Sequence, residues 1–495
     1  MTTPPAAVEL PAVQPGLVTP GRLAALVIWG LAWLLLLHFT RQSPPGDNAE
    51  RLTWVRALAW GYHKHPPLPT AMLWPLVQVF GLSLWLPDLL GATTTLIALV
   101  LTHQLVARLC GSHRAALAML GTLCVGFYTH RLSFFNHDVV LMPCVALAAT
   151  CCWRALAHHS GRAWWGLGLA MGFGLLAKYQ AVLMAVPVLV CWAHARGLRD
   201  AQHRRGLLIA VLLALVIVSP NLVWVATHDF LPLRYVAGNS LMPTPSLVRS
   251  ANSVSNWAGG VLTQLVGPLL LGTGLCWRTG PSEPATQRAV ALKVGADVRL
   301  FLFAWGMLPL ILLALLALLL RARLHLNWAM AYLPLTCATL MLAVGASRWE
   351  RVRMRDALWG FALIQLVLAA YMAATSNAGT LVYDDKRLRN FAAGAVTAAV
   401  GPPARAALGG PIRVIAGRQR LVGGIALMLD EQPLVLLDGR LDISPWVPPD
   451  LPQACGVLWM GRSGDDPPVG IQVHPIGNSL WWGVSPPAGP ASLCR

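Results

Sequence analysis

GLLIAVLLALVIVSPNLVWVAT, residues 206–227, runs for 22 residues without a charged side chain. About 20 consecutive apolar residues are needed for a helix to cross the hydrocarbon core of a bilayer, so this stretch predicts a transmembrane helix. Similar apolar runs recur along the chain. We therefore expect about eleven transmembrane helices, near residues 22–40, 86–107, 113–130, 138–157, 163–180, 181–195, 206–227, 257–277, 300–320, 326–346 and 357–375.

The composition agrees with a membrane protein. Of the 495 residues, 56% are hydrophobic and only 12% are charged, whereas a soluble chain carries roughly 25% charged residues. The net charge of +17 would favour a nucleic-acid partner in a soluble protein, but here the basic residues gather in alternate loops. This is the positive-inside bias of membrane proteins, so we expect no nucleic acid as a partner.

The same bias predicts the topology. With the N-terminus in the cytoplasm, the cytoplasmic loops hold most of the arginines between the predicted helices, for example those at 108, 114, 154, 162, 196, 199, 204, 205, 348, 351, 353 and 355. The opposite side receives the loop 41–85 and the C-terminal segment. We expect residues 1–21 to be disordered and residues 22–375 to form the transmembrane domain.

Residues 376–495 differ from the preceding chain in amino-acid composition. Gly and Pro are frequent, PLVLLDG (433–439) and CGVLWMG (455–461) resemble strands, and RQRLVGGIALMLDE (418–431) has helical spacing of apolar residues. This predicts a small α/β domain outside the membrane. Cys455 and Cys494 could form a disulfide there, but the sequence leaves their pairing open.

The loop 41–85 contains an acidic cluster, GDNAE (46–50), and a rigid polar elbow, WGYHKHPPL (60–68). Residues 52–61 and 68–81 are amphipathic enough to lie in the membrane interface as short helices. The consecutive prolines of the elbow restrict the backbone and would fix the angle between the two helices. We expect this to hold Tyr62 and His65 toward a cavity.

Ionisable residues at membrane depth are costly and commonly face a cavity. Three occur at notable places: Asp47 after the first span, Asp138 at the mouth of the fourth, and Lys178 within about 30 apolar residues. The two carboxylates could instead cap helices, the lysine could extend to the interface, and the elbow residues could be solvated. Because the predicted topology places all of them on one side, carboxylates facing a lysine would suit an enzyme that handles a phosphate leaving group.

Six motifs in order resemble the bacterial GT-C glycosyltransferases that use polyprenyl-phosphate sugars, relatives of protein O-mannosyltransferases and of the aminoarabinose–lipid A transferase. The resemblance covers about residues 20–375. It rests on GDNAERLTW (46–54), GYHKHPPL (61–68), FFNHDVVL (134–141), GLGLAMGFGLLAKYQAVL (166–183), SPNLVWVATHDFLPLRY (219–235) and LNWAMAYLPL (326–335).

This resemblance implies a GT-C fold and roles for individual residues. Asp47 matches the acid of the first loop that assists the acceptor or binds metal, and Asp138 matches the second acid. The remaining matches are expected to bind substrate: Lys178 and Tyr179 near the donor phosphate, with Tyr62, His65 and Asn327 around them.

The sequence also departs from the family pattern. Asn48 stands where a second acid is common, Arg51 where an aromatic is usual, and Lys64-His65 where the lipid A transferases carry Glu-Lys before the prolines. A divalent cation, with Asp47 and Asp138 as candidate ligands, therefore stays open as a cofactor.

The function implied is an inverting glycosyltransferase of the bacterial inner membrane. It would move a sugar from a polyprenyl-phosphate donor to a periplasmic acceptor such as lipid A or another glycan. The surrounding membrane lipids would be further partners. A lipid-sugar transporter or flippase and a catalytically inactive partner subunit remain alternatives. The inverted repeats and helices broken at the midplane that are frequent in transporters are not evident in the sequence.

Overall fold

The computed structural model describes residues 19–241, 246–278, 294–343, 346–376, 379–385, 387–488 and 494. The expectation of a disordered N-terminus falls on residues 1–18, which lie outside the described residues. The first helix starts directly after them, because the side chain of Thr19 accepts a hydrogen bond from the backbone of Arg22 and Pro20 occupies the first helical turn.

Six described helices are long and apolar enough to cross a membrane. They are α1 (Pro20–Phe39), α4 (Trp85–Cys110), α6 (His137–Ala157), α9 (Ala201–Thr227), α11 (Leu247–Arg278) and α16 (Met354–Ala374). A seventh candidate span is the pair α12 (Ala296–Gly306) and α13 (Leu308–Leu319), which meet at an angle of 41°. The chain is therefore a multi-pass membrane protein.

The other expected spans are shorter helices, so the number eleven stays a prediction. They are α5 (Ser112–Thr122), α7 (Gly161–Ala177), α8 (Ala185–His194) and α14 (Leu333–Ala343). The expected span 113–130 is interrupted after Thr122, where the chain turns toward α11 through a short 3-10 helix, Gly126–Tyr128. A Cβ at Gly126 would lie 2.4 Å from Cε1 of His130 and 2.7 Å from Oε1 of Gln264 on α11, so a larger residue would displace these side chains.

The loop 41–85 folds differently from the expectation in its first half. Its helix α2 spans Gly46–Trp54 instead of residues 52–61, and residues 48–54 are buried and do not lie on a surface. The reason is tertiary: helix α18 (Gln419–Met428) of the C-terminal domain covers α2. In the second half, α3 (Leu68–Phe80) confirms the expected helix 68–81.

The C-terminal residues form the expected α/β domain. Its five-stranded sheet has the order β2-β1-β3-β5-β4, with β1 parallel to both β2 and β3 and the remaining pairs antiparallel. The strands are β1 (Val414–Gly417), β2 (Leu434–Leu437), β3 (Val457–Arg462), β4 (His474–Ile476) and β5 (Leu480–Ser485), and α17 (Ala393–Leu408) and α19 (Leu451–Cys455) accompany α18. Cys455 and Cys494 form a disulfide, with their Cα atoms 5.3 Å apart.

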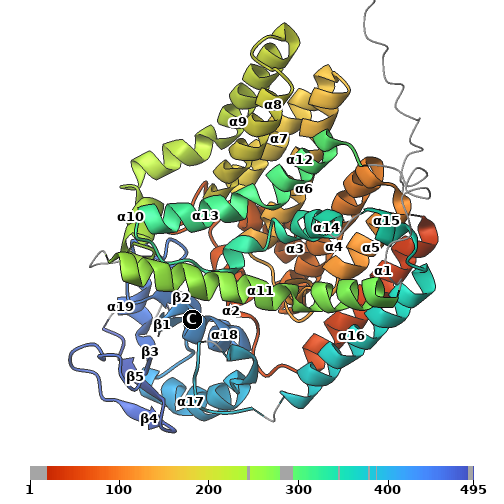
Figure 1. Cartoon of the computed structure of the whole chain (residues 1–495). Helices are drawn as coiled ribbons and strands as arrows, with labels where there is room; N and C mark the ends of the chain where they lie inside the picture. Colours follow the sequence, from red (N-terminus) through yellow and green to blue (C-terminus); the bar gives the residue numbers. More distant parts are fainter. Residues whose placement is uncertain are drawn as a thin grey trace, which may run out of the picture.

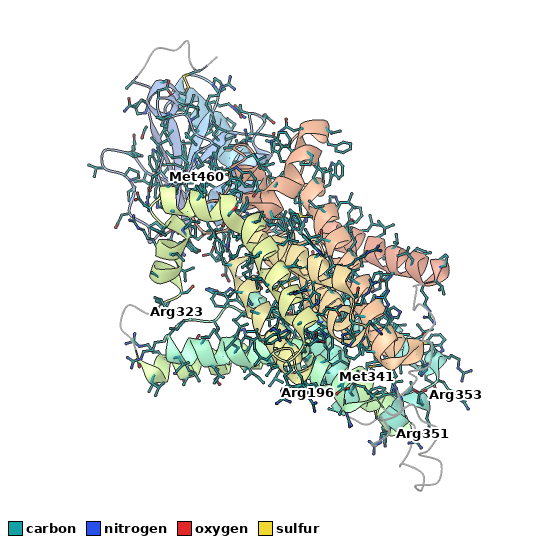
Figure 2. All side chains as sticks on the ribbon, turned by 90° about the horizontal axis from the view of Figure 1, so that it is seen from above. Arg196, Arg323, Met341, Arg351, Arg353 and Met460 are labelled. Atoms are coloured by element: carbon teal, nitrogen blue, oxygen red, sulfur yellow. A yellow bond between two sulfur atoms is a disulfide. The ribbon has the colours of Figure 1, made fainter. Side chains whose placement is uncertain are left out.

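The sheet domain lies at one end of the helical bundle (Figure 1), and α10 (Leu231–Asn239) and the start of α11 extend toward it. Figure 2 shows Arg196, Arg351 and Arg353 at the end away from Met460 of the sheet. These arginines come from the loops that the sequence assigns to one side of the membrane. Their common location agrees with that assignment.

Candidate functional site

Asp47 lies in the first turn of α2, where Pro45 and Gly46 begin the helix. Its Oδ2 accepts a hydrogen bond of 2.8 Å from Nδ2 of Asn136. It forms no ion pair with any other residue that the structure describes. The capping alternative is excluded for Asp47, because no side chain caps α2. Its carboxylate is instead directed to a cavity that it helps to line.

Asn48, which stands next to Asp47 where the family commonly has a second acid, holds helix α2 in place. Its Nδ2 donates to Oδ1 of Asp88 and to the carbonyl of Ser133, and its Oδ1 accepts from the backbone of Phe135, each at 2.8 Å. A carboxylate at this position could accept but not donate, so the amide suits the site better than an acid. These three bonds fix α2 against α4 and against the segment that leads into α6.

Asp138 and Lys178 form a buried ion pair, with Nζ of Lys178 2.5 Å from Oδ1 of Asp138. The N-cap residue of α6 is Asn136, whose Oδ1 accepts a hydrogen bond of 3.0 Å from the backbone N–H of Val139. Asp138 therefore does not cap this helix. Lys178 is 7% exposed and lies 5.7 Å from the ring of Trp328, so it does not extend to a membrane interface. Asp47 is close enough to act electrostatically on Asp138.

A second charged cluster involves Glu50, which the sequence analysis did not include among the site residues. Its carboxylate oxygens each lie 2.5 Å from a cation, Lys64 of the elbow and Arg51 of the same helix. Burial alone would raise the pKa of Glu50, but the two cations outweigh burial and lower the pKa to about 2. Arg51, which stands where the family pattern has an aromatic residue, belongs to this network and also lies 3.7 Å from the ring of Trp54.

The depressed pKa predicts a pH dependence of stability. Because the folded-state pKa of about 2 lies below the ordinary value of 4.5, the contribution of the Glu50 carboxylate is present above pH 4.5 and is lost as the pH falls toward 2. We expect the wild-type protein to unfold at a higher temperature than Glu50→Gln at pH 7, and the gap to narrow below pH 4.5. Tryptophan fluorescence during heating, at a series of pH values, measures this difference in unfolding temperature. A gap of constant size down to pH 3 would contradict the assignment.

A cavity of about 2090 Å³ opens beside Asp47. Its walls come from α11, α16 and the segments 124–134 and 325–327. Residue 385, residues 387–390 and Arg420 of the C-terminal region also line it. Leu363, Val367 and Tyr371 give the α16 side an apolar surface. Ligand pockets for small molecules measure roughly 300–1,000 Å³, so this cavity is large enough for a lipid.

Six arginines line the cavity. Arg41 pairs with Asp88 and Arg355 with Asp356, and the other four are Arg131, Arg387, Arg389 and Arg420. None of these four lies within 4.0 Å of a carboxylate in the part of the chain that the structure describes. Arg131 donates to Oδ1 of Asn327 at 2.6 Å, and Arg389 donates to the hydroxyl of Thr375 at 2.8 Å. The sequence analysis missed all four. Arg131 precedes the FFNHD motif and could have been noticed, but the others belong to a separate domain.

Tyr62 and His65 of the elbow do not line this cavity. Tyr62 stacks on Trp54, with ring centroids 4.5 Å apart, and its hydroxyl donates to the carbonyl of Ala57 at 3.0 Å. His65 packs 4.0 Å from the ring of His137, and burial lowers the pKa of His65 well below its ordinary value. The elbow thus packs against Trp54 in the hydrophobic cluster that includes the core of the sheet domain. A substrate-binding role of Tyr62 and His65 stays a prediction.

Asn327 does line the cavity and is held by Arg131. Tyr179 does not line it and lies near Asn221 of α9. Among the predicted site residues, Asp47 and Asn327 line the cavity, whereas Asp138 and Lys178 do not. Lys178 lies near Trp328, the neighbour of Asn327 in the chain.

A divalent cation at Asp47 and Asp138 finds no support in the arrangement of the described side chains. Asp138 is already neutralised by Lys178, and no group of three His, Cys, Asp or Glu side chains with metal-ligand spacing includes either acid within the described ranges. Cation dependence of the site remains a prediction.

Comparisons with known proteins agree with this arrangement. Residues 64–224 match the family described as dolichyl-phosphate-mannose-protein mannosyltransferase. The lipid A galacturonosyltransferase RgtD of Rhizobium johnstonii is 26% identical over 223 residues, which are 43% of this chain and 46% of that protein. The lipopolysaccharide core galacturonosyltransferase RgtB of the same organism is 31% identical over 201 residues, 39% of this chain and 40% of that protein. The matches thus span less than half the length of these relatives.

The whole fold resembles ArnT from Cupriavidus metallidurans. The apo structure of ArnT covers 96% of this chain and 98% of its own length with a TM-score of 0.65 and 14% sequence identity. The structure of ArnT bound to undecaprenyl phosphate gives a TM-score of 0.63, with 16% identity over 94% of this chain and 98% of ArnT. The expected GT-C fold is therefore confirmed, as is the resemblance to GT-C glycosyltransferases.

Proposed function

We propose that this chain, a membrane protein with the GT-C fold, is a glycosyltransferase that moves a sugar from a polyprenyl-phosphate donor to a lipid acceptor with anionic groups. The observation that carries the proposal is Asp47 on the wall of a lipid-sized cavity, with the buried ion pair of Asp138 and Lys178 near it. The matched relatives are named as galacturonosyltransferases of lipid A or of the lipopolysaccharide core, and ArnT binds undecaprenyl phosphate.

In the proposed reaction an acceptor hydroxyl attacks the anomeric carbon of the donor sugar. The bond between that carbon and the phosphate oxygen breaks, and polyprenyl phosphate leaves with the bonding electrons. Asp47 takes the proton of the hydroxyl, since its carboxylate faces the cavity without an ion-pair partner in the described chain. Lys178 stabilises the charge that develops on the leaving phosphate, and Asp138 positions the lysine. Attack from the side opposite the phosphate inverts the anomeric centre.

The unpaired arginines support an anionic acceptor in the cavity. Arginine binds phosphate and carboxylate groups through two parallel hydrogen bonds, and four guanidinium groups without acidic partners surround one space. The apolar wall on α16 would receive acyl chains from the bilayer. Lipid A, with its phosphates and acyl chains, fits both features.

The orientation is part of the proposal. The disulfide between Cys455 and Cys494 favours an oxidising compartment for the sheet domain, because structural disulfides are rare in the cytosol. The arginine-rich loops at the opposite end (Figure 2) favour the cytoplasm. We place the cavity on the periplasmic side of a bacterial inner membrane.

The arginines give a prediction for acceptor binding. We expect Arg420→Gln to raise the KM for the acceptor about 10-fold, because a charge-assisted hydrogen bond contributes about 1.5–3 kcal/mol, while the KM for the donor stays constant. Arg418→Gln is the matched control, since Arg418 pairs with Asp465 and does not line the cavity. Steady-state kinetics in nanodiscs measure both constants. An unchanged acceptor KM in Arg420→Gln and in Arg389→Gln would contradict an acceptor in this cavity.

The experiment that tests the function is product analysis. The purified protein in nanodiscs is incubated with undecaprenyl-phosphate galacturonate and lipid A, and the lipids are analysed by mass spectrometry. Lipid A heavier by one sugar residue supports the proposal. Movement of the donor across the bilayer of sealed vesicles without any covalent product would favour a transporter instead.

A further inference from the structure

His159, Asp200 and His203 meet at the end of the bundle opposite the sheet domain. His159 lies in the turn between α6 and α7, and Asp200 and His203 lie at the start of α9, two segments that stand side by side at the top of Figure 1. One ligand atom of each residue lies within 4.8 Å of the other two. The imidazole rings of the two histidines are stacked, with centroids 5.0 Å apart.

His203 is an unusual member of this group because it is buried and has no hydrogen-bond partner. Its side chain is 3% exposed, and neither Nδ1 nor Nε2 has a partner within hydrogen-bond distance. Buried polar groups are nearly always satisfied, so an orphaned imidazole requires an explanation. An ion bound at one of the nitrogens would supply it.

The two carboxylate oxygens of Asp200 have different surroundings. Oδ1 caps α9, accepting from the backbone of Gln202 at 2.7 Å and of His203 at 3.2 Å. Oδ2 lies 3.9 Å from Nδ1 of His159 and 3.6 Å from Nδ1 of His203, too far for hydrogen bonds. Two ligands of a tetrahedral zinc ion, each at about 2.0–2.2 Å from the metal, are roughly 3.4 Å apart. The two distances from Oδ2 are therefore close to the spacing that such an ion needs, and the ligand atoms of the two histidines lie within 4.8 Å of each other.

We propose that His159, Asp200 and His203 bind a divalent transition-metal ion, with Zn²⁺ as the best fit. Two imidazole nitrogens and one carboxylate oxygen are a donor set typical of zinc, whereas Ca²⁺ and Mg²⁺ prefer oxygen ligands alone. A fourth position is open to solvent on the side of His159, whose side chain is 60% exposed. The ion joins the α6–α7 turn to the start of α9 and stabilises their packing. This site is separate from the proposed transferase centre and does not depend on it.

The test measures Zn²⁺ binding to the full-length protein in nanodiscs after removal of metals with a chelator. His159→Asn and Asp200→Asn are the informative variants: His159 is exposed, and asparagine at 200 can still cap α9. His158→Asn is the matched control, an exposed histidine next to the site that does not belong to it. Elemental analysis gives the number of ions per chain, and thermal unfolding with and without Zn²⁺ gives the stabilisation.

We expect the wild-type protein and His158→Asn to bind Zn²⁺ and to unfold at a higher temperature when it is present. His159→Asn and Asp200→Asn should bind about one ion fewer per chain and lose the Zn²⁺-dependent increase in unfolding temperature. Substitution of Co²⁺ for Zn²⁺ should give a visible absorption band that the same two variants lose. Equal metal content and equal stabilisation in all four proteins, or no binding by the wild type, would overturn the proposal.

Discussion

Asp47→Asn is expected to abolish sugar transfer while leaving the fold intact. General-base catalysis contributes roughly 10²–10⁴-fold to a rate, so kcat should fall by about that factor. The substitution is nearly isosteric, and the amide oxygen can still accept the hydrogen bond that Asn136 donates to Asp47. The unfolding temperature and the KM for the donor should therefore change little.

Asp385→Asn is the matched control for this experiment. Asp385 also lines the cavity, but it accepts a hydrogen bond from Tyr383 and lies in the C-terminal segment, away from Asn136. A fall in kcat in Asp47→Asn alone identifies the base. If Asp47→Asn retains more than about a tenth of the wild-type kcat, which corresponds to a loss of less than 1.4 kcal/mol, Asp47 is not the base.

Lys178→Met is expected to damage both stability and activity, and a second substitution separates the two effects. Removing one partner of a buried ion pair leaves an uncompensated charge and costs about 3–5 kcal/mol. The single variant should therefore unfold at a clearly lower temperature. The double variant Asp138→Asn/Lys178→Met removes both charges of the pair, and we expect it to recover most of the lost stability.

The activity of these two variants should not follow their stability. If Lys178 stabilises the leaving phosphate, the double variant stays inactive although it is folded, because no cation replaces the lysine. Arg114→Met is the control, since the buried Arg114 pairs at 2.9 Å with the exposed Glu350 and neither residue lines the cavity. Its loss should lower stability without lowering kcat. A double variant that transfers sugar at the wild-type rate would show that the pair is purely structural.

The sequence predicted the membrane class and the C-terminal domain because both depend on local composition. Long apolar runs such as residues 206–227 and the strand-like segments near 433–439 and 455–461 appear in the structure close to their expected positions. The topology predicted Asp138 and Lys178 on the same side of the membrane. Their direct ion pair, between residues 40 positions apart, is a finding of the structure.

Other features could not be predicted because they depend on tertiary contacts. The expected helix at 52–61 was wrong, since α18 from the distant C-terminal domain buries the earlier segment 46–54. The same domain supplies Arg389 and Arg420 to the cavity, a contact between segments far apart in the sequence. The departure at Asn48 is explained only by the three partners that surround it.

The most direct test of the proposed function is the release of polyprenyl phosphate. The purified protein in nanodiscs is given a panel of polyprenyl-phosphate sugars together with lipid A, and the released polyprenyl phosphate is quantified for the wild type and for Asp47→Asn. We predict release from one donor of the panel, dependent on the acceptor and lost in the variant. No release from any donor, or equal release by both proteins, would contradict a glycosyltransferase centred on Asp47.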